Sequence, residues 1–196
     1  MPFTAEARPI DESQEWRQVS AFGMSRDELI ALRDSHALRC PDPLCRATLY
    51  VRLPVAARFH FYHKPSEGSG ECLLRGGESP LHIEAKSAVV EWVERQDRYH
   101  GCQVSLEHIF DNGEARRVAD VLVQMPDGET HVIECQVSNQ TVEEFQTRTR
   151  DYYRLGADYV LWFIDEEKAR GDLGSWARSQ WEIGYMTIKD DVRKIL

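Results

Sequence analysis

Residues 116–136 read RRVADVLVQMPDGETHVIECQ, and this stretch decides the fold of the chain. Its two ends, 116–124 and 130–137, are rich in the β-branched and apolar residues that strands favour. Between them lies MPDGE, whose Asp127-Gly128 dipeptide is typical of a hairpin turn. The stretch therefore predicts two neighbouring antiparallel strands joined by a tight turn.

The sequence on either side of this hairpin predicts further regular elements. Before it, Ser79 can cap a helix over about 80–96, with Pro80 at the first position, and a strand follows at 104–110. After it come an amphipathic helix over about 142–155, which Gly156 ends, and the apolar strand YVLWFI from residue 159. Residues 78–164 are thus expected to form an α/β core in the order αβββαβ.

Two carboxylates occupy matching positions on the predicted hairpin. Glu134 and Gln136 share one face of their strand, and Asp120 on the preceding strand can approach them across the turn. Carboxylate oxygens suit Mg²⁺ or Mn²⁺, which retain several waters and leave room for a phosphate oxygen. We therefore predict metal-assisted phosphodiester hydrolysis, with Asp120 and Glu134 as metal ligands and Gln136 positioning water or phosphate. The alternative for Asp120 is an ordinary acid at a strand edge.

Three polar residues, one just before the helix predicted over about 80–96 and two within it, are spaced by four and complete the predicted catalytic set. His82 and Lys86 border its apolar stripe and can reach toward the sheet, and Glu78 precedes its first turn. Lys86 is predicted to stabilise charge or orient the attacking water. Glu78 and His82 are predicted to bind a second ion or the waters of the first. Taken alone, His82 would be a boundary histidine and Lys86 a solvated lysine.

The whole chain limits the class of protein. Its 196 residues can form one well-buried domain and a small appendage. Since there is no apolar signal core and no run of roughly 20 apolar residues, we expect a soluble, cytoplasmic protein. The net charge of −9 argues against strong, nonspecific binding to DNA through phosphate neutralisation. It does not exclude a nuclease, because bound metal ions offset the acidity of a carboxylate site.

Residues 40–77 are rich in loops and carry a candidate zinc site. Five cysteines, an odd number, argue against a disulfide framework. A structural Zn²⁺ would supply folding energy that this segment cannot obtain from burial. The candidate ligands are Cys40, Cys45, His63 and Cys72. His60 is a rival fourth ligand, ordinary reduced cysteines are the alternative, and Cys102 and Cys135 are expected to be buried thiols.

The remaining segments carry no assignable chemistry. Residues 1–39 are expected to be an N-terminal extension with one helix over about 25–33. Residues 165–196 are expected to be a C-terminal extension with a short strand at 184–188. The predicted organisation is therefore 1–39, a zinc-binding module at 40–77, the core at 78–164, and 165–196.

From residue 40 to about 162, the motifs together resemble the competence protein CoiA nuclease-like family, a branch of the PD-(D/E)xK nucleases. The resemblance is carried by Cys72 and by HFYHK (60–64), ESPLHIEAK (78–86), RRVADV (116–121), IECQVS (133–138) and FQTRTRDYYRLG (145–156). It implies a restriction-endonuclease-like core preceded by a small zinc-binding module. It also implies DNA as substrate, in uptake, processing or recombination, and uptake or recombination proteins as partners.

The resemblance also implies roles for individual residues. The acids of RRVADV and IECQVS, which are Asp120 and Glu134, are the family's metal ligands, and the cysteine pair, His63 and Cys72 hold its zinc. Gln136 stands where the superfamily name calls for lysine, so Lys86 is the candidate for the missing cation. Arg148 is a candidate DNA contact facing the site. Tyr152 is expected to be a core residue.

Two other functions are alternatives to the nuclease hypothesis. A catalytically silent adaptor would keep the fold and bind DNA or a recombination partner, and both Gln136 and the acidic net charge favour it. A zinc hydrolase that uses His60 and His63 is the weaker alternative, because no general base accompanies them.

Overall fold

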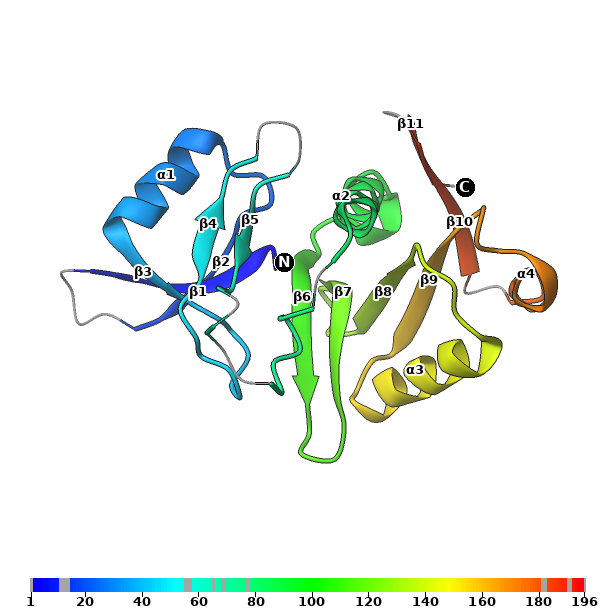
Figure 1. Cartoon of the computed structure of the whole chain (residues 1–196). Helices are drawn as coiled ribbons and strands as arrows, with labels where there is room; N and C mark the ends of the chain where they lie inside the picture. Colours follow the sequence, from blue (N-terminus) through cyan, green and yellow to red (C-terminus); the bar gives the residue numbers. More distant parts are fainter. Residues whose placement is uncertain are drawn as a thin grey trace. The chain divides into compact units, whose positions relative to one another are not determined.

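The computed structural model describes residues 2–10, 15–54, 58–64, 66–67, 70–76, 78–180, 183–189 and 192–195. They belong to two compact units, Met1–Glu78 and Ser79–Leu196, each of which has its own sheet (Figure 1). Parts of the predicted loops, residues 65, 68, 69 and 77, lie outside the described residues. Among the helices of the described ranges, none combines the length and apolarity that a membrane span requires.

The first unit is organised around a small antiparallel sheet of order β2-β1-β3. Its elements are β1 (Thr4–Pro9), β2 (Arg17–Ser20), α1 (Arg26–Ser35), β3 (His36–Arg39), β4 (Tyr50–Arg52) and β5 (His60–Tyr62). The predicted helix is confirmed as α1, which a capping box of Ser25 and Glu28 begins. The three strands around it were not predicted, because they are short and mostly polar.

The predicted N-terminal extension, residues 1–39, and the predicted zinc-binding module that follows it share one core in this unit. Phe3, Leu29 and Phe61 are all fully buried, although they come from both segments. The Phe61 amide donates to the carbonyl of Pro2 at 2.8 Å, which ties the β4–β5 hairpin to the start of β1. Residues 1–39 are therefore part of the fold of the cysteine-bearing segment.

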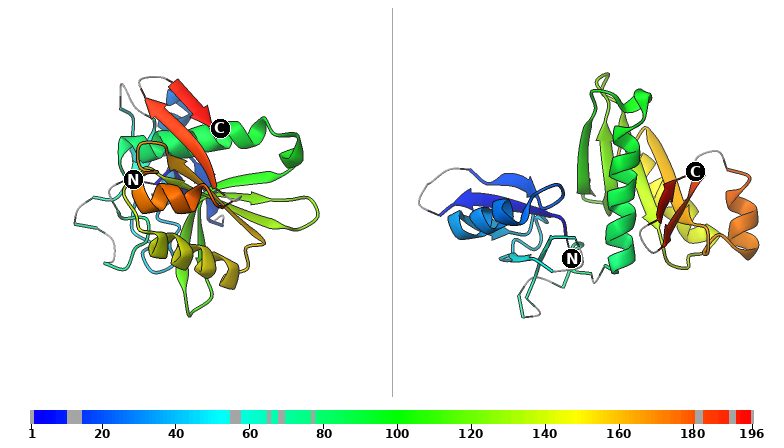
Figure 2. Two further views of the ribbon diagram at one scale, coloured as in Figure 1. Left: turned by 90° about the vertical axis from the view of Figure 1, so that its right-hand side faces the viewer. Right: turned by 90° about the horizontal axis from the view of Figure 1, so that it is seen from above.

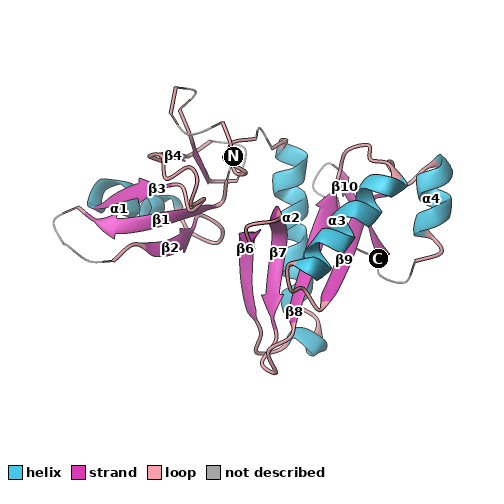
Figure 3. Ribbon diagram, turned by 90° about the horizontal axis from the view of Figure 1, so that it is seen from below, coloured by secondary structure: helices cyan, strands magenta, loops and turns pink. Residues whose placement is uncertain are grey.

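The second unit is built on a six-stranded mixed sheet of order β11-β10-β9-β8-β7-β6 (Figure 3). Strands β8, β9 and β10 run parallel, and the other neighbouring pairs run antiparallel. Its elements are α2 (Pro80–Glu94), η1 (Asp97–Tyr99), β6 (Gln103–Asp111), β7 (Arg116–Gln124), β8 (Thr130–Gln136), α3 (Val142–Arg154), β9 (Tyr159–Asp165), α4 (Gly171–Ala177), β10 (Ile183–Lys189) and β11 (Val192–Ile195). The predicted αβββαβ order and the short strand after it are confirmed, whereas η1, α4 and β11 were not predicted.

Helices α2 and α3 cover opposite faces of this sheet (Figure 2). On β9, the ring of Phe163 lies 5.0 Å from that of Trp92 on α2, measured between centroids. The preceding residue, Trp162, lies 4.5 Å from Phe145 on α3. Because successive strand residues point to opposite faces, these contacts assign one helix to each face.

The predicted hairpin between β7 and β8 is also confirmed. The Met125 amide donates to the carbonyl of Glu129 at 2.8 Å, and Gly128 has a φ of 97°, which glycine adopts without strain. Backbone pairing runs from Gln124↔Thr130 to Val121↔Ile133. The turn thus sets the register that determines which residues of the two strands face each other.

Candidate functional site

Three acidic residues lie in one row across β6, β7 and β8, where the backbone pairing of β7 with β8 ends. The last pair of that ladder is Val121↔Ile133, so the next positions on the two strands are Asp120 and Glu134. The register of β6 with β7 places Glu107 opposite Asp120. The hairpin therefore brings the two predicted carboxylates to adjacent strand positions, and β6 adds a third acid that was not predicted.

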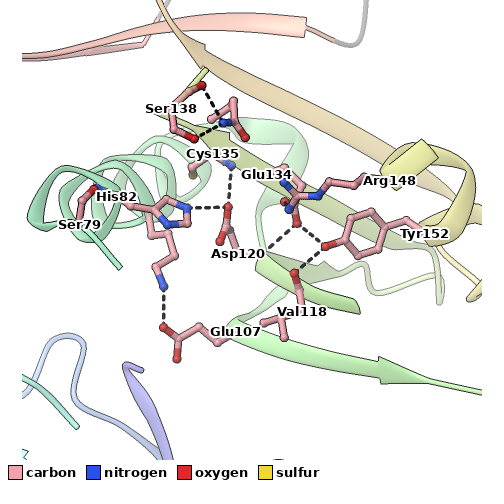
Figure 4. A network of polar contacts seen from close by, with 12 residues as sticks. Ser79, His82, Glu107, Val118, Asp120, Glu134, Cys135, Ser138, Arg148 and Tyr152 are labelled. Atoms are coloured by element: carbon pink, nitrogen blue, oxygen red, sulfur yellow. Dashed lines mark hydrogen bonds and ion pairs between the residues drawn. The ribbon is translucent and has the colours of Figure 1, made fainter. Parts of the chain in front are cut away.

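Asp120 is a buried carboxylate whose one oxygen is fixed by two donors (Figure 4). Its Oδ2 accepts from His82 Nε2 at 3.0 Å and from the Cys135 amide at 2.8 Å. Burial alone would raise the pKa of Asp120, but the charge and hydrogen bond of His82, the charge of Lys86 and the Cys135 amide lower that pKa to about 2. Its Oδ1 has no partner among the described residues, so it remains an acceptor for a ligand.

Glu134 is fully buried and lies in a denser network. Its Oε1 accepts from the Tyr152 hydroxyl at 2.6 Å and from the Asp120 amide at 3.3 Å, and its Oε2 forms an ion pair with Arg148. Burial raises the pKa of Glu134 to about 7, with a contribution from the charge of Asp120, and Arg148 and Tyr152 only partly oppose this. The two neighbouring carboxylates therefore differ in acidity.

The helix residues Arg148 and Tyr152 both reach the site from α3. Arg148 remains charged: burial lowers its pKa, but its interactions with Glu134, Tyr152 and Asp120 together raise that pKa by more. The Tyr152 hydroxyl donates to Glu134 and lies 2.6 Å from the Val118 carbonyl, which connects α3 to β7 and β8. Tyr152 is thus buried as expected, but its hydroxyl is also part of the carboxylate network.

Lys86 reaches the row of acids from α2. It is fully buried, and its Nζ donates to Glu107 Oε1 at 2.5 Å. Gln136 donates through Nε2 to the carbonyl and hydroxyl of Ser138, each at 2.8 Å. The two side chains therefore have different hydrogen-bond partners, Glu107 for Lys86 and Ser138 for Gln136.

Glu107 is a site residue that sequence reasoning missed. Its φ of 55° lies in the left-handed region, which costs a residue with a side chain about 1–3 kcal/mol. The ladder of β6 with β7 continues on both sides of it. The only signal in the sequence is that an acid stands inside the strand-like run VSLEHIF, at a position where a buried apolar residue would be expected.

We expect Lys86→Met to lower the free energy of unfolding of the second unit by about 3–5 kcal/mol, because it leaves the buried Glu107 charge without the lysine. Lys86→Met combined with Glu107→Gln should recover much of that loss, since neither charge then remains. Urea unfolding of the two variants and the unchanged protein measures both effects. Equal destabilisation by the single and double variants would contradict the ion pair.

The described residues contain one oxygen-rich group with metal-binding geometry near the start of α2. Glu78, His82 and Asp120 each offer a ligand atom, and these atoms lie within 4.8 Å of one another. Glu134 is not in this group, and its oxygens accept from Arg148 and Tyr152. The group joins Asp120 to His82 on α2 and to Glu78 just before that helix, and Asp120 and Glu134 as a pair of metal ligands stay a prediction.

A second group in the first unit has the geometry of a tetrahedral metal site. Its members, within 4.8 Å of one another, are Cys40, Cys45, His63 and Cys72. The Sγ atoms of Cys40 and Cys72 are 3.7 Å apart, and His63 Nε2 lies 3.4 Å from Cys45 Sγ and 3.8 Å from Cys72 Sγ. Tetrahedral zinc with the usual bond lengths would separate two sulfurs by about 3.8 Å, and a sulfur from a nitrogen by about 3.6 Å. The residues therefore fit a zinc ion.

His60 is not part of this group. It belongs to β5, and its Nδ1 lies 3.0 Å from the Arg58 carbonyl. His63 follows the end of the strand, where its ring meets the cysteines. The structure thus assembles the four residues favoured by the sequence and not the set with the rival histidine.

Asp42, inside CPDPLC, connects the two halves of the cysteine group and was not predicted. Its fully buried carboxylate accepts from the Leu44 amide at 2.9 Å and from the Leu73 amide at 2.8 Å. Leu73 follows Cys72, so Asp42 joins the first cysteine turn to the last ligand. Burial raises the pKa of Cys72 to about 11, so the thiols stay neutral unless a cation compensates their charge.

The other two cysteines, Cys102 and Cys135, lie in the second unit. Cys135 is buried as predicted, but Cys102 is only partly buried, with its Sγ 3.2 Å from Met125 Sδ. Neither is a member of a metal-binding group within the described ranges.

A solved structure, "SPO1766 protein of unknown function from Silicibacter pomeroyi", is 24% identical over 57% of this chain and 69% of that chain. The TM-score is 0.34, which is too low to show a shared fold. No curated protein matches the chain significantly.

The family comparison is more informative, because its match includes every element of the carboxylate site. The description of the family is "Competence protein CoiA, nuclease-like domain", and the match spans residues 78–191. That span is more than half of the 196 residues. The chain therefore belongs to the competence protein CoiA nuclease-like family.

Proposed function

We propose that the second unit is a Mg²⁺- or Mn²⁺-dependent deoxyribonuclease with a PD-(D/E)xK core, acting in DNA uptake, processing or recombination. Family membership supports a nuclease-like function, and the αβββαβ order agrees with such a core. The observation that carries the proposal is the adjacent placement of Asp120 and Glu134 at the end of the β7–β8 ladder. Buried acids at neighbouring strand positions are costly unless they bind something cationic.

In this proposal, Asp120 with Glu78 and His82 would hold one ion, and Glu134 would contribute to the same centre. A bound Mg²⁺ or Mn²⁺ would polarise the phosphodiester and lower the pKa of a water. Asp120 is already oriented by His82 and by the Cys135 amide, so it would lose little freedom on binding.

The neutral and cationic residues around the acids would position the substrate. The side-chain amide nitrogen of Gln136 donates to Ser138, so its side-chain carbonyl oxygen would accept a hydrogen bond from a water. Arg148 is the partly exposed cation next to Glu134, so it is better placed to meet a phosphate than the buried Lys86. Lys86 would act indirectly, by holding Asp120 in its ionised form.

We further infer that the Cys40, Cys45, His63 and Cys72 group holds a structural zinc. Three thiols and one imidazole are a common structural zinc set, and their separations fit a tetrahedral ion. All four ligand positions come from protein side chains, which leaves no open position for a substrate. This arrangement argues against the zinc-hydrolase reading.

The main alternative is a silent adaptor that binds DNA or a recombination partner, and one observation favours it. Arg148 neutralises Glu134 and Lys86 neutralises Glu107, so part of the network is satisfied without a divalent ion. A plasmid-degradation assay with Mn²⁺ separates the two functions. Degradation that requires Mn²⁺ and Asp120 supports the nuclease, and binding of DNA without any degradation supports the adaptor.

The raised pKa of Glu134 predicts a pH-dependent stability. Since its ordinary value is 4.5 and its folded value is about 7, the protonated carboxyl favours the folded state. This stabilisation is complete below about pH 4.5 and is lost as the pH rises toward 7. Urea unfolding of zinc-loaded protein without magnesium should therefore show a larger loss of stability between about pH 5 and about pH 7.5 than the Glu134→Gln variant shows. The same pH dependence in both proteins would refute the assignment.

A further inference from the structure

A pocket of about 310 Å³ lies beside α3, apart from the row of acids. Gln146, Thr149, Arg150 and Tyr153 line it from one face of α3, at the spacing of successive helical turns. β9, α4 and the start of β10 form the other walls. Its volume is at the lower end of the range for sites that bind small molecules or single groups of a larger ligand.

The lining of this pocket combines aromatic rings with amide groups. Trp162 is buried in its wall, Trp176 is half-buried, and the Tyr153 side chain is exposed at its edge. The side-chain amide of Gln146 has no partner within the part of the chain that the structure describes, and it offers both a donor and an acceptor. Flat rings beside an amide suit a planar heterocycle with hydrogen-bonding edges, such as a nucleobase.

The charge of the pocket favours an anionic ligand. Among the described residues, no acid lines it and its one cation is Arg150, although the chain as a whole carries a net charge of −9. Arg150 is held by the Gln146 carbonyl at 3.3 Å and by the Thr147 hydroxyl at 3.1 Å. Its guanidinium is therefore fixed near the pocket, where it can meet a phosphate.

One indole ring connects the pocket with the carboxylate network. Arg148, which pairs with Glu134, has its Cζ 5.0 Å from the centroid of the Trp162 ring. The Trp162 Nε1 donates to Thr149 at 3.0 Å, which fixes the ring beside α3. A group in the pocket would therefore touch the same tryptophan on which Arg148 lies.

We propose that this pocket receives an unstacked base of single-stranded DNA, with Tyr153 and Trp176 stacking on the base and Arg150 meeting a neighbouring phosphate. This inference rests on the proposed nuclease function and narrows its substrate to single strands. A base within a duplex is stacked on both faces and paired along its edge, so it cannot enter such a pocket without being extruded. Single strands present their bases without that penalty.

The test measures binding, so it does not depend on cleavage. A fluorescein-labelled oligothymidylate of about 15 nucleotides is titrated with the Asp120→Asn protein of residues 1–196, zinc-loaded and without magnesium or manganese, and anisotropy is recorded. Tyr153→Ala in that background should weaken binding by about tenfold or more, because a stacking ring is lost. Tyr159→Ala is the matched control, since Tyr159 is exposed to a similar degree, 40% against 44%, and lies outside the pocket.

A second pair of variants tests the phosphate contact. Arg150→Ala should weaken binding and lower the slope of log affinity against log salt by about one. Arg154→Ala removes the same charge one turn further along, from a residue that does not line the pocket, and should have the smaller effect.

The outcomes separate the pocket from the nuclease. Equal binding by Tyr153→Ala and Tyr159→Ala, or equally strong competition by the corresponding duplex, would overturn the proposal that the pocket binds a base of single-stranded DNA. If the otherwise unchanged protein cleaves DNA and both tyrosine variants bind equally, the base-binding pocket is refuted and the nuclease proposal stands. Binding that depends on Tyr153 and Arg150, with no cleavage in the presence of either Mg²⁺ or Mn²⁺, would support the base-binding pocket and refute the nuclease proposal.

Discussion

Replacing Asp120 with asparagine is expected to lower metal-dependent DNA cleavage by a factor of about a thousand or more, the scale seen when a catalytic metal loses a ligand. The change removes one negative charge but keeps the side-chain volume. The asparagine carbonyl can still accept from the Cys135 amide, so β7 and β8 should stay in place. Initial rates on a labelled plasmid with Mn²⁺ measure the effect, and near-ultraviolet circular dichroism checks the fold.

Asp127→Asn is the control for this prediction. Asp127 lies in the turn of the same hairpin, is exposed, and accepts from the Glu129 amide, a bond that asparagine can also make. It therefore removes the same charge from the same hairpin without touching the row of acids. Retained activity in Asp120→Asn, or equal loss in both variants, would place the catalytic centre elsewhere.

The second large effect is expected from Cys45→Ser, which removes one thiolate from the Cys₃His group. Structural zinc in small domains contributes about 10–16 kcal/mol of apparent binding free energy, and much of this is folding free energy. With one thiolate missing, the zinc content should fall from about one ion per chain, and the first unit should lose its protection from proteolysis. Metal analysis and limited proteolysis of protein purified without chelator measure the two results.

Cys102→Ser provides the comparison, because Cys102 is also partly buried but contacts Met125 in the second unit. It should keep the zinc and the protease resistance of the first unit. Protein that contains no zinc when purified without chelator, or equal behaviour of the two serine variants, would contradict the structural zinc site.

The parts of the fold that the sequence predicted are those whose signals are local. Ser79 and Pro80 mark the start of α2, Asp127 and Gly128 form the hairpin turn, and Gly156 follows α3 with a φ of 99°. Each depends on the conformational preference of one or two residues. By contrast, the strands β1, β2 and β3 are polar and short, so their pairing becomes visible only once the buried core between them exists.

The parts of the site that were missed depend on partners far apart in the sequence. Lys86 and Glu107 are 21 residues apart, and no pattern shows that the lysine would meet this acid and not Glu134. Tyr152 was expected to be in the core, and it is, but its hydroxyl direction follows from the packing of α3 on β7 and β8. The cysteine ligands were easier to find, because few other residues can hold zinc.

The end of the β7–β8 ladder has a consequence for amide hydrogen exchange. Up to Val121↔Ile133 the amides of the hairpin are held by backbone carbonyls, whereas the amides of Asp120 and Cys135 donate to the carboxylates of Glu134 and Asp120. Ladder amides exchange when the strands separate, but these two can exchange when a carboxylate merely turns away. Their exchange rates would therefore report movement of the acidic side chains, in solution and without any substrate, while their neighbours report the opening of the sheet.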